Sequence, residues 1–117
     1  GCTLGGAAAG GVIGNEATDA PHVAGKSGGG IFNDLNTEAT IDGTQVTNNT
    51  AEREFGGGIK NGGVLTFTGG EIAGNSAGVH AGGIENASGT LRLVNTSVTD
   101  NTATTGGGIF NVSAGTL

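Results

Sequence analysis

A six-residue box, Gly-Gly-Gly-Ile-x-Asn, recurs along the chain and constrains its fold more than any other feature. The box is complete at 28–33, 56–61 and 106–111, and residues 81–86 carry it with alanine in the first position. The isoleucines of successive boxes are 28, 25 and 25 residues apart. A fixed period of about 20–50 residues is typical of solenoids, propellers and other repeat architectures. The sequence therefore predicts a single repeating domain over residues 1–117.

A second box and a short alternating segment complete each repeat. The second box, Val/Ile-x-x-Asn-x-Ala, occupies 12–17, 46–51, 72–77 and 98–103. Between the two boxes, apolar and polar residues alternate at 39–42, 65–68 and 91–94, which indicates short strands with one face inward. With three such strands in each coil of about 26 residues, the sequence predicts an all-β parallel β-helix of about four coils.

Aligning the boxes predicts which side chains form the core. Residues that occupy the same position in successive coils should stack in a column along the solenoid, and each fully buried aliphatic side chain contributes roughly 1.5–3 kcal/mol. The predicted inward columns are Ile31, Ile59, Ile84 and Ile109; Ala39, Leu65, Leu91 and Leu117; Ile41, Phe67 and Leu93; and Val12, Val46, Ile72 and Val98.

The same alignment predicts two asparagine ladders. Asparagine tolerates left-handed backbone geometry, and its amide can bond to the equivalent amide one coil away, so we interpret both ladders as structural. The first ladder is Asn33, Asn61, Asn86 and Asn111, and the second ladder is Asn15, Asn49, Asn75 and Asn101.

Composition excludes several classes of protein. Glycine makes up 27 of 117 residues but is not placed at every third position, which excludes collagen. The net charge is −6 and the four basic residues are scattered, so nucleic-acid binding is not expected. No apolar run approaches the roughly 20 residues of a membrane span. Residues 18–27, which include the only proline, Pro21, are predicted to form a loop insertion.

The chain offers no recognisable catalytic, cofactor or metal site. Polysaccharide-cleaving β-helices need paired carboxylates or an acidic cluster that holds Ca²⁺. Here the alignment places the acids on different corners, and His22 and His80 stand alone as predicted surface-loop residues. A carbohydrate-active enzyme therefore remains only an alternative. The acids concerned are Asp19, Glu38, Asp42, Glu52, Glu54 and Asp100.

Ice binding is a second alternative, because a flat solenoid face with regularly spaced threonine can bind ice. The predicted outward columns contain several threonines, although Arg92 interrupts the column of Thr40 and Thr66. Threonine also favours strands on a solvated face because its Cβ is branched.

The two alternating boxes resemble the repeats of the polymorphic outer-membrane proteins, whose hallmark is Gly-Gly-Ala-Ile alternating with Phe-x-x-Asn, and those of right-handed β-helix proteins of bacterial surfaces. Here glycine replaces the alanine before isoleucine, and Val or Ile stands where that family has Phe. The resemblance implies a right-handed coil and an extracellular or cell-surface location. It also implies an adhesive role and brings no catalytic residues. We expect a structural or adhesive module without cofactors, and the candidate ligands are a glycan, the host matrix and, for the second alternative, ice.

The two ends of the chain are predicted to be in phase. Gly115-Thr116-Leu117 repeats Gly89-Thr90-Leu91, and Cys2-Thr3-Leu4 can be aligned with the same element. Solenoids need caps to protect the strand edges of their terminal repeats. We therefore expect either a segment of a longer solenoid or units that stack end to end as a filament, with Leu117 of one unit against Leu4 of the next.

Overall fold

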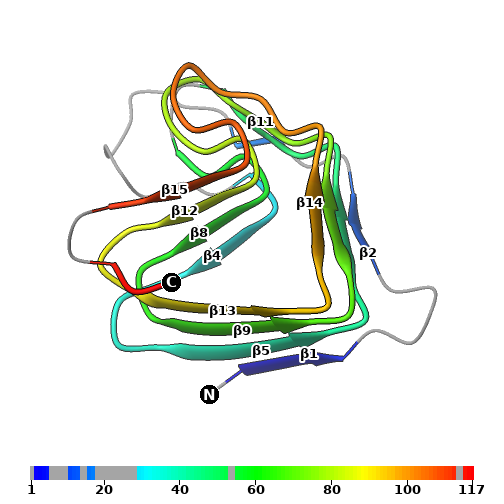
Figure 1. Ribbon diagram of the computed structural model, residues 1–117, viewed down its shortest axis with the longest axis vertical. Coiled ribbons are helices and arrows are strands. Elements are labelled where there is room, and N and C mark those ends of the chain that lie inside the picture. Colours follow the sequence, from blue (N-terminus) through cyan, green and yellow to red (C-terminus); the bar gives the residue numbers. More distant parts are fainter. Residues whose placement is uncertain (1, 6–10, 14–15, 18–28, 53–54, 113–114) are drawn as a thin grey trace.

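The structure of the chain is a computed structural model that describes residues 2–5, 11–13, 16–17, 29–52, 55–112 and 115–117. Within these residues it contains strands, turns and bends but no helix. The strands stack as a parallel β-solenoid of about three turns (Figure 1). The all-β solenoid predicted from the repeats is therefore confirmed. The four predicted coils appear as four strand layers in three of the sheets.

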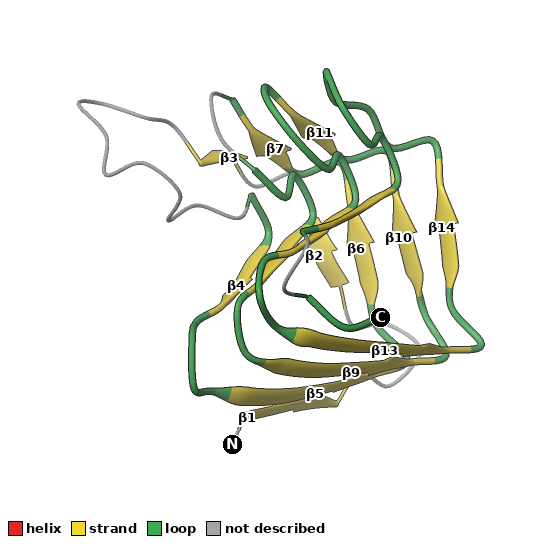
Figure 2. Ribbon diagram, turned by 60° about the vertical axis from the view of Figure 1, so that its left-hand side comes forward, coloured by secondary structure: helices red, strands yellow, loops and turns green. Residues whose placement is uncertain are grey.

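Four parallel sheets run along the solenoid axis (Figure 2). Sheet A contains β1 (Cys2–Gly5), β5 (Glu38–Asp42), β9 (Val64–Thr68) and β13 (Thr90–Val94). Sheet B contains β2 (Gly11–Ile13), β6 (Gln45–Thr47), β10 (Glu71–Ala73) and β14 (Ser97–Thr99). Sheet C contains β3 (Glu16–Ala17), β7 (Thr50–Ala51) and β11 (Ser76–Ala77). Sheet D contains β4 (Ile31–Asn33), β8 (Ile59–Asn61), β12 (Ile84–Asn86) and β15 (Ile109–Asn111).

Sheet C is an addition to the three strands predicted for each coil. Its strands are only two residues long and end at the alanine of the second box. Two residues are too few to show the alternation that reveals a strand in a sequence. In the last coil the same position is held by an isolated bridge between Ser76 and Thr102.

The observed strand register matches the predicted columns from the second coil onward. Ile59 pairs with Ile31 on one side and with Ile84 on the other, and Leu65 lies between Ala39 and Leu91. The column of Phe67 and that of Ile72 are also in the predicted register, with Val12 paired to Val46.

The predicted alignment of the first strand is wrong by two residues. Cys2 pairs with Ala39 and Leu4 pairs with Ile41, whereas the sequence alignment placed Leu4 in the column of Ala39. A shift of two residues preserves the in-and-out alternation of a strand, so the hydrophobic pattern cannot detect it. Leu117 therefore corresponds to Cys2 and not to Leu4, because Thr116 bridges to Thr90 one residue before Leu91.

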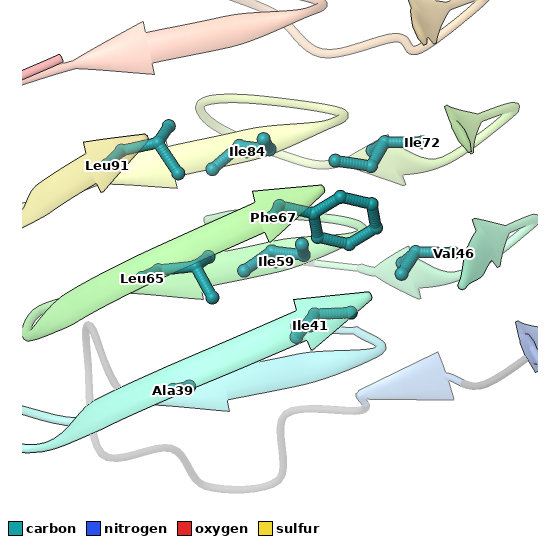
Figure 3. Close-up of a cluster of buried hydrophobic side chains, with 9 residues drawn as sticks. All are labelled: Ala39, Ile41, Val46, Ile59, Leu65, Phe67, Ile72, Ile84 and Leu91. Atoms are coloured by element: carbon teal, nitrogen blue, oxygen red, sulfur yellow. The ribbon is translucent and has the colours of Figure 1, made fainter. Parts of the chain in front are cut away.

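The core lies between the sheets and consists of the predicted columns. Its largest side chain, Phe67, is completely buried, as are Ile59, Leu65, Ile72 and Ile84 (Figure 3). At the outer layers, Ile31, Leu93, Val98 and Ile109 are only partly buried and pack against this cluster. Leu117 is 66 % exposed and does not join the core as predicted, because no further described strand covers that layer.

Left-handed backbone geometry occurs at all four corners of the coil, and Asn36 and Ser88 adopt it at the corner between sheets D and A. Gly43, Gly69 and Asn95 hold φ values of 60°, 61° and 49° at the corner between sheets A and B. Asparagine, aspartate and glycine adopt this region more readily than other residues do. The remaining corner columns with positive φ are Asn48, Gly74 and Asp100, and Gly56, Ala81 and Gly106.

Candidate functional site

The first asparagine ladder lies at the corner between sheets D and A. Each asparagine is the last residue of a strand of sheet D. Side chains alternate along a strand and the preceding residue points outward, so the asparagine side chain points into the solenoid. The Asn33 Nδ2 donates to Asn61 Oδ1 at 2.7 Å, Asn61 Nδ2 donates to Asn86 Oδ1 at 2.8 Å, and Asn86 Nδ2 donates to Asn111 Oδ1 at 2.8 Å. The predicted ladder is therefore confirmed over its full length.

These amides also fix the corner that follows each of them. Asn61 Nδ2 donates to the Gly63 carbonyl of its own coil and to the Thr90 carbonyl of the next coil. Asn86 Nδ2 repeats this pattern with the Gly89 and Thr116 carbonyls. Each buried amide thereby ties the turn in its own coil to the start of the next coil.

The second ladder lies at the corner between sheets B and C. Asn75 Oδ1 accepts from both the backbone N–H and the Nδ2 of Asn49, at 2.9 and 3.0 Å. Asn75 Nδ2 donates to Asn101 Oδ1 at 2.9 Å and to the Val46 carbonyl at 2.8 Å. The ladder is confirmed from Asn49 to Asn101, and the predicted member Asn15 lies outside the described residues.

The glycines of the first box pack directly against the second ladder. A Cβ added to Gly58 would lie 2.7 Å from the Gly83 carbonyl oxygen and 3.0 Å from Asn75 Nδ2. The equivalent atom on Gly83 would lie 2.5 Å from the Gly108 carbonyl oxygen and 3.0 Å from Asn101 Nδ2. No side chain fits at either distance, so the two boxes recur together because each glycine makes room for an asparagine.

A second buried cluster, which the sequence did not predict, lies on the outer face of sheet D. Lys60 on β8 and Glu85 on β12 point away from the core, yet they are only 6 % and 4 % exposed. The Lys60 Nζ lies 3.9 Å from Glu85 Oε1 and 4.7 Å from the centre of the Phe55 ring. The cluster is therefore an ion pair removed from water outside the main core.

Three stacked rings flank this ion pair, and we call them the aromatic cover. The His80 ring centre lies 5.2 Å from that of Phe55 and 4.4 Å from that of Phe110. His80, which was predicted to be a surface-loop residue and not a ligand, is half-buried and lies outside the named strands, where backbone bridges join it to Phe55 and Thr105. The His80 ring is therefore stacked between the two phenylalanine rings.

A shallow groove crosses the corner between sheets D and A. It arises because successive corners differ in length: four residues follow Asn33, two glycines follow Asn61, and three residues follow Asn86. The groove is lined by Leu35, which is 62 % exposed, and by Val64, which is 44 % exposed, among other residues. It is the candidate surface for an adhesive ligand.

Two of the described acidic residues lie on one strand and are held well apart. Glu38 and Asp42 share the outer face of β5, where four residues at roughly 3.3 Å each separate them by about 13 Å. Retaining and inverting glycosidases hold their carboxyl groups about 5–9.5 Å apart. No group of three metal-ligating side chains occurs among the described residues, and Asp19, His22 and Glu54 lie outside them.

The predicted threonine columns do form on the outer face of sheet A. Thr40 is paired with Thr66, and Thr66 is paired with Arg92, as the alignment placed them. Arg92 is exposed and ends this pair of threonines with a long charged side chain. Within the part of the chain that the structure describes, there is no helix of the length and hydropathy needed to cross a membrane.

The comparisons with known proteins find no match: no family model, no curated protein and no solved structure is significantly similar to the chain. The resemblance to outer-membrane passenger repeats therefore rests on the two sequence boxes.

Proposed function

We propose that the chain is a non-catalytic structural module of an extracellular bacterial surface protein. The proposal rests on the hydrogen bonds of the buried side-chain amides. Five asparagines with 0–6 % exposure form hydrogen bonds to the asparagine of an adjacent coil and to backbone groups. Buried polar groups joined in this way stiffen a fold, because each leaves a costly unpaired group if a coil separates. The extracellular location rests on the resemblance of the repeats. The five asparagines are Asn33, Asn49, Asn61, Asn75 and Asn86.

The module further extends by stacking end to end, with a second copy of the chain as the partner. Its last strand layer presents partly buried Leu93 and Ile109, which belong to the same columns as the buried residues below them. The first layer, at β1, β2 and β4, carries the complementary parallel edge in the same register. In such a stack Leu117 lies at the level of Cys2, so residues 115–117 must shift to admit β1 of the second copy.

Light scattering and electron microscopy test this stacking. We expect rods that lengthen with protein concentration, and we expect Leu93→Glu to shorten them because it places a charge on the last strand layer, which forms the stacking surface. Leu35→Glu is the control, since Leu35 is an exposed leucine at the corner between sheets D and A. A monodisperse monomer at high concentration, without rods, would refute the end-to-end contact.

An adhesive role is the second function to test, and the groove beside Leu35 and Val64 is the observation that favours it. Purified protein should be assayed against immobilised glycans, host-matrix proteins and ice. Saturable binding that Val64→Lys abolishes would assign the ligand to this groove. Cleavage of a polysaccharide by the purified chain would overturn the non-catalytic proposal.

A further inference from the structure

Two features of the interior do not distinguish one coil from another. Ile59, Ile84 and Ile109 are identical residues in one column, and the ladder residues Asn61 and Asn86 are identical in another. If the coil that contains β9 to β12 were looped out, β5 could pair with β13 and β8 with β15, and the isoleucine column and the ladder would keep their pattern. That arrangement would lose the buried side chains of Leu65, Phe67 and Ile72, although a closing loop of that length costs little more entropy than a short one. The isoleucine column and the ladder therefore specify stacking but not the order of the coils.

The outer face of sheet D does carry a distinguishing pattern. Its outward column reads Phe32, Lys60, Glu85 and Phe110, so opposite charges meet only between β8 and β12. Lys60 and Glu85 are buried, and a buried charge that loses its partner is strongly destabilising. In the looped-out arrangement Lys60 would face Phe110 in place of Glu85.

We propose that the ion pair between Lys60 and Glu85, which lies beside the aromatic cover, helps to fix the order in which the coils stack. Both charged residues are buried and Lys60 lies against the Phe55 ring, which makes the loss of either partner more costly than on an open surface. The cover also spans the coils concerned, since Phe55, His80 and Phe110 come from three successive coils. The pair acts on the choice between alternative stackings rather than on a ligand.

Engineered disulfides can report which strands are neighbours after refolding. In a Cys2→Ser background, Thr40→Cys with Thr66→Cys reports the observed order, because these residues are paired on β5 and β9. Thr40→Cys with Arg92→Cys reports the looped-out order. In the observed fold these two strands are separated by β9, about 9.5 Å apart at strand spacing and beyond the reach of a disulfide.

The decisive comparison is between an apolar pair and a reversed pair. In Lys60→Met with Glu85→Met, an apolar pair packs in place of the charges and the chain is expected to fold. The yield of the looped-out cross-link should rise about tenfold over that of the parent. This factor is expected when a charge-assisted contact no longer contributes to the free-energy difference between the two arrangements. The reversed pair, Lys60→Glu with Glu85→Lys, should keep the cross-link near the parent level, since the charges still meet only between β8 and β12.

The native-order cross-link and circular dichroism confirm folding in each variant. Glu71→Gln is the matched control, because Glu71 points outward on β10 between uncharged Gln45 and Ser97. The proposal is overturned if the apolar pair shows no more looped-out cross-link than the parent. It is equally overturned if the reversed pair or Glu71→Gln raises that cross-link as much as the apolar pair does.

Discussion

Asn75→Ala is the most informative single change, because Asn75 is the central residue of the second ladder and has no exposed surface. The substitution removes four hydrogen bonds: two that Asn75 Oδ1 accepts from Asn49, and two that its Nδ2 donates to Val46 and Asn101. At about 1 kcal/mol net for each bond, the free energy of unfolding should fall by about 4 kcal/mol. That is a large part of the roughly 5–15 kcal/mol typical of a domain.

Urea unfolding followed by circular dichroism measures this loss. With an m-value of about 1.5 kcal/mol per molar urea, the midpoint should move down by about 2–3 M while the slope stays unchanged. The control is Asn95→Gly, which removes an exposed amide and retains a residue suited to the φ of 49°. The control should change stability by less than about 0.5 kcal/mol. Equal midpoints for Asn75→Ala and Asn95→Gly would refute the energetic role of the ladder.

Four further variants test the core and the corners. Ile84→Asp should abolish cooperative thermal unfolding, because it places a carboxylate at a site with no exposure; a retained cooperative melt would contradict the core assignment. Gly58→Ala should cost about 3 kcal/mol in urea unfolding, since its Cβ would lie 2.7 Å from the Gly83 carbonyl oxygen; an unchanged midpoint would show that the coils can separate at that point. Gly69→Ala should cost about 1 kcal/mol from its φ of 61° alone, because no atom lies within 4 Å of the added Cβ. Gly69→Asn should cost less, as Asn95 holds the equivalent corner, and equal melting temperatures for the two variants would argue against backbone strain.

The columns and ladders could be predicted because they repeat. Ile31 and Ile59 are 28 residues apart where later coils use 25, yet the box around each isoleucine fixes the register independently of the loop between them. The second ladder was predictable for the same reason, since the spacing of 26 residues between Asn49, Asn75 and Asn101 equals one coil. Burial and bonding then follow from register alone.

The outer cluster could not be predicted from the repeat, because it occupies the variable position of the first box. The outward position next to Ile59 is predicted to be solvent-exposed, and a lysine at position 60 agrees with that prediction. Its burial depends on Phe55 and His80, which lie on corner segments without periodic sequence. The one signal available was the opposite charge of Lys60 and Glu85 at equivalent positions of adjacent coils.

The two asparagine ladders give the solenoid an electrical direction. In every described rung the Nδ2 points towards the later coil and the Oδ1 towards the earlier one, from Asn33 to Asn111 and from Asn49 to Asn101. Amide dipoles of about 3.5 D each therefore add along the axis, whereas the strand dipoles of a sheet largely cancel. At the two ends of the first ladder the chain itself bonds the terminal amides: Asn33 Oδ1 accepts from Thr37 Oγ1, and Asn111 Nδ2 donates to the Gly115 carbonyl. A coil stacked in the opposite orientation would place Nδ2 against Nδ2 or Oδ1 against Oδ1 in the ladders.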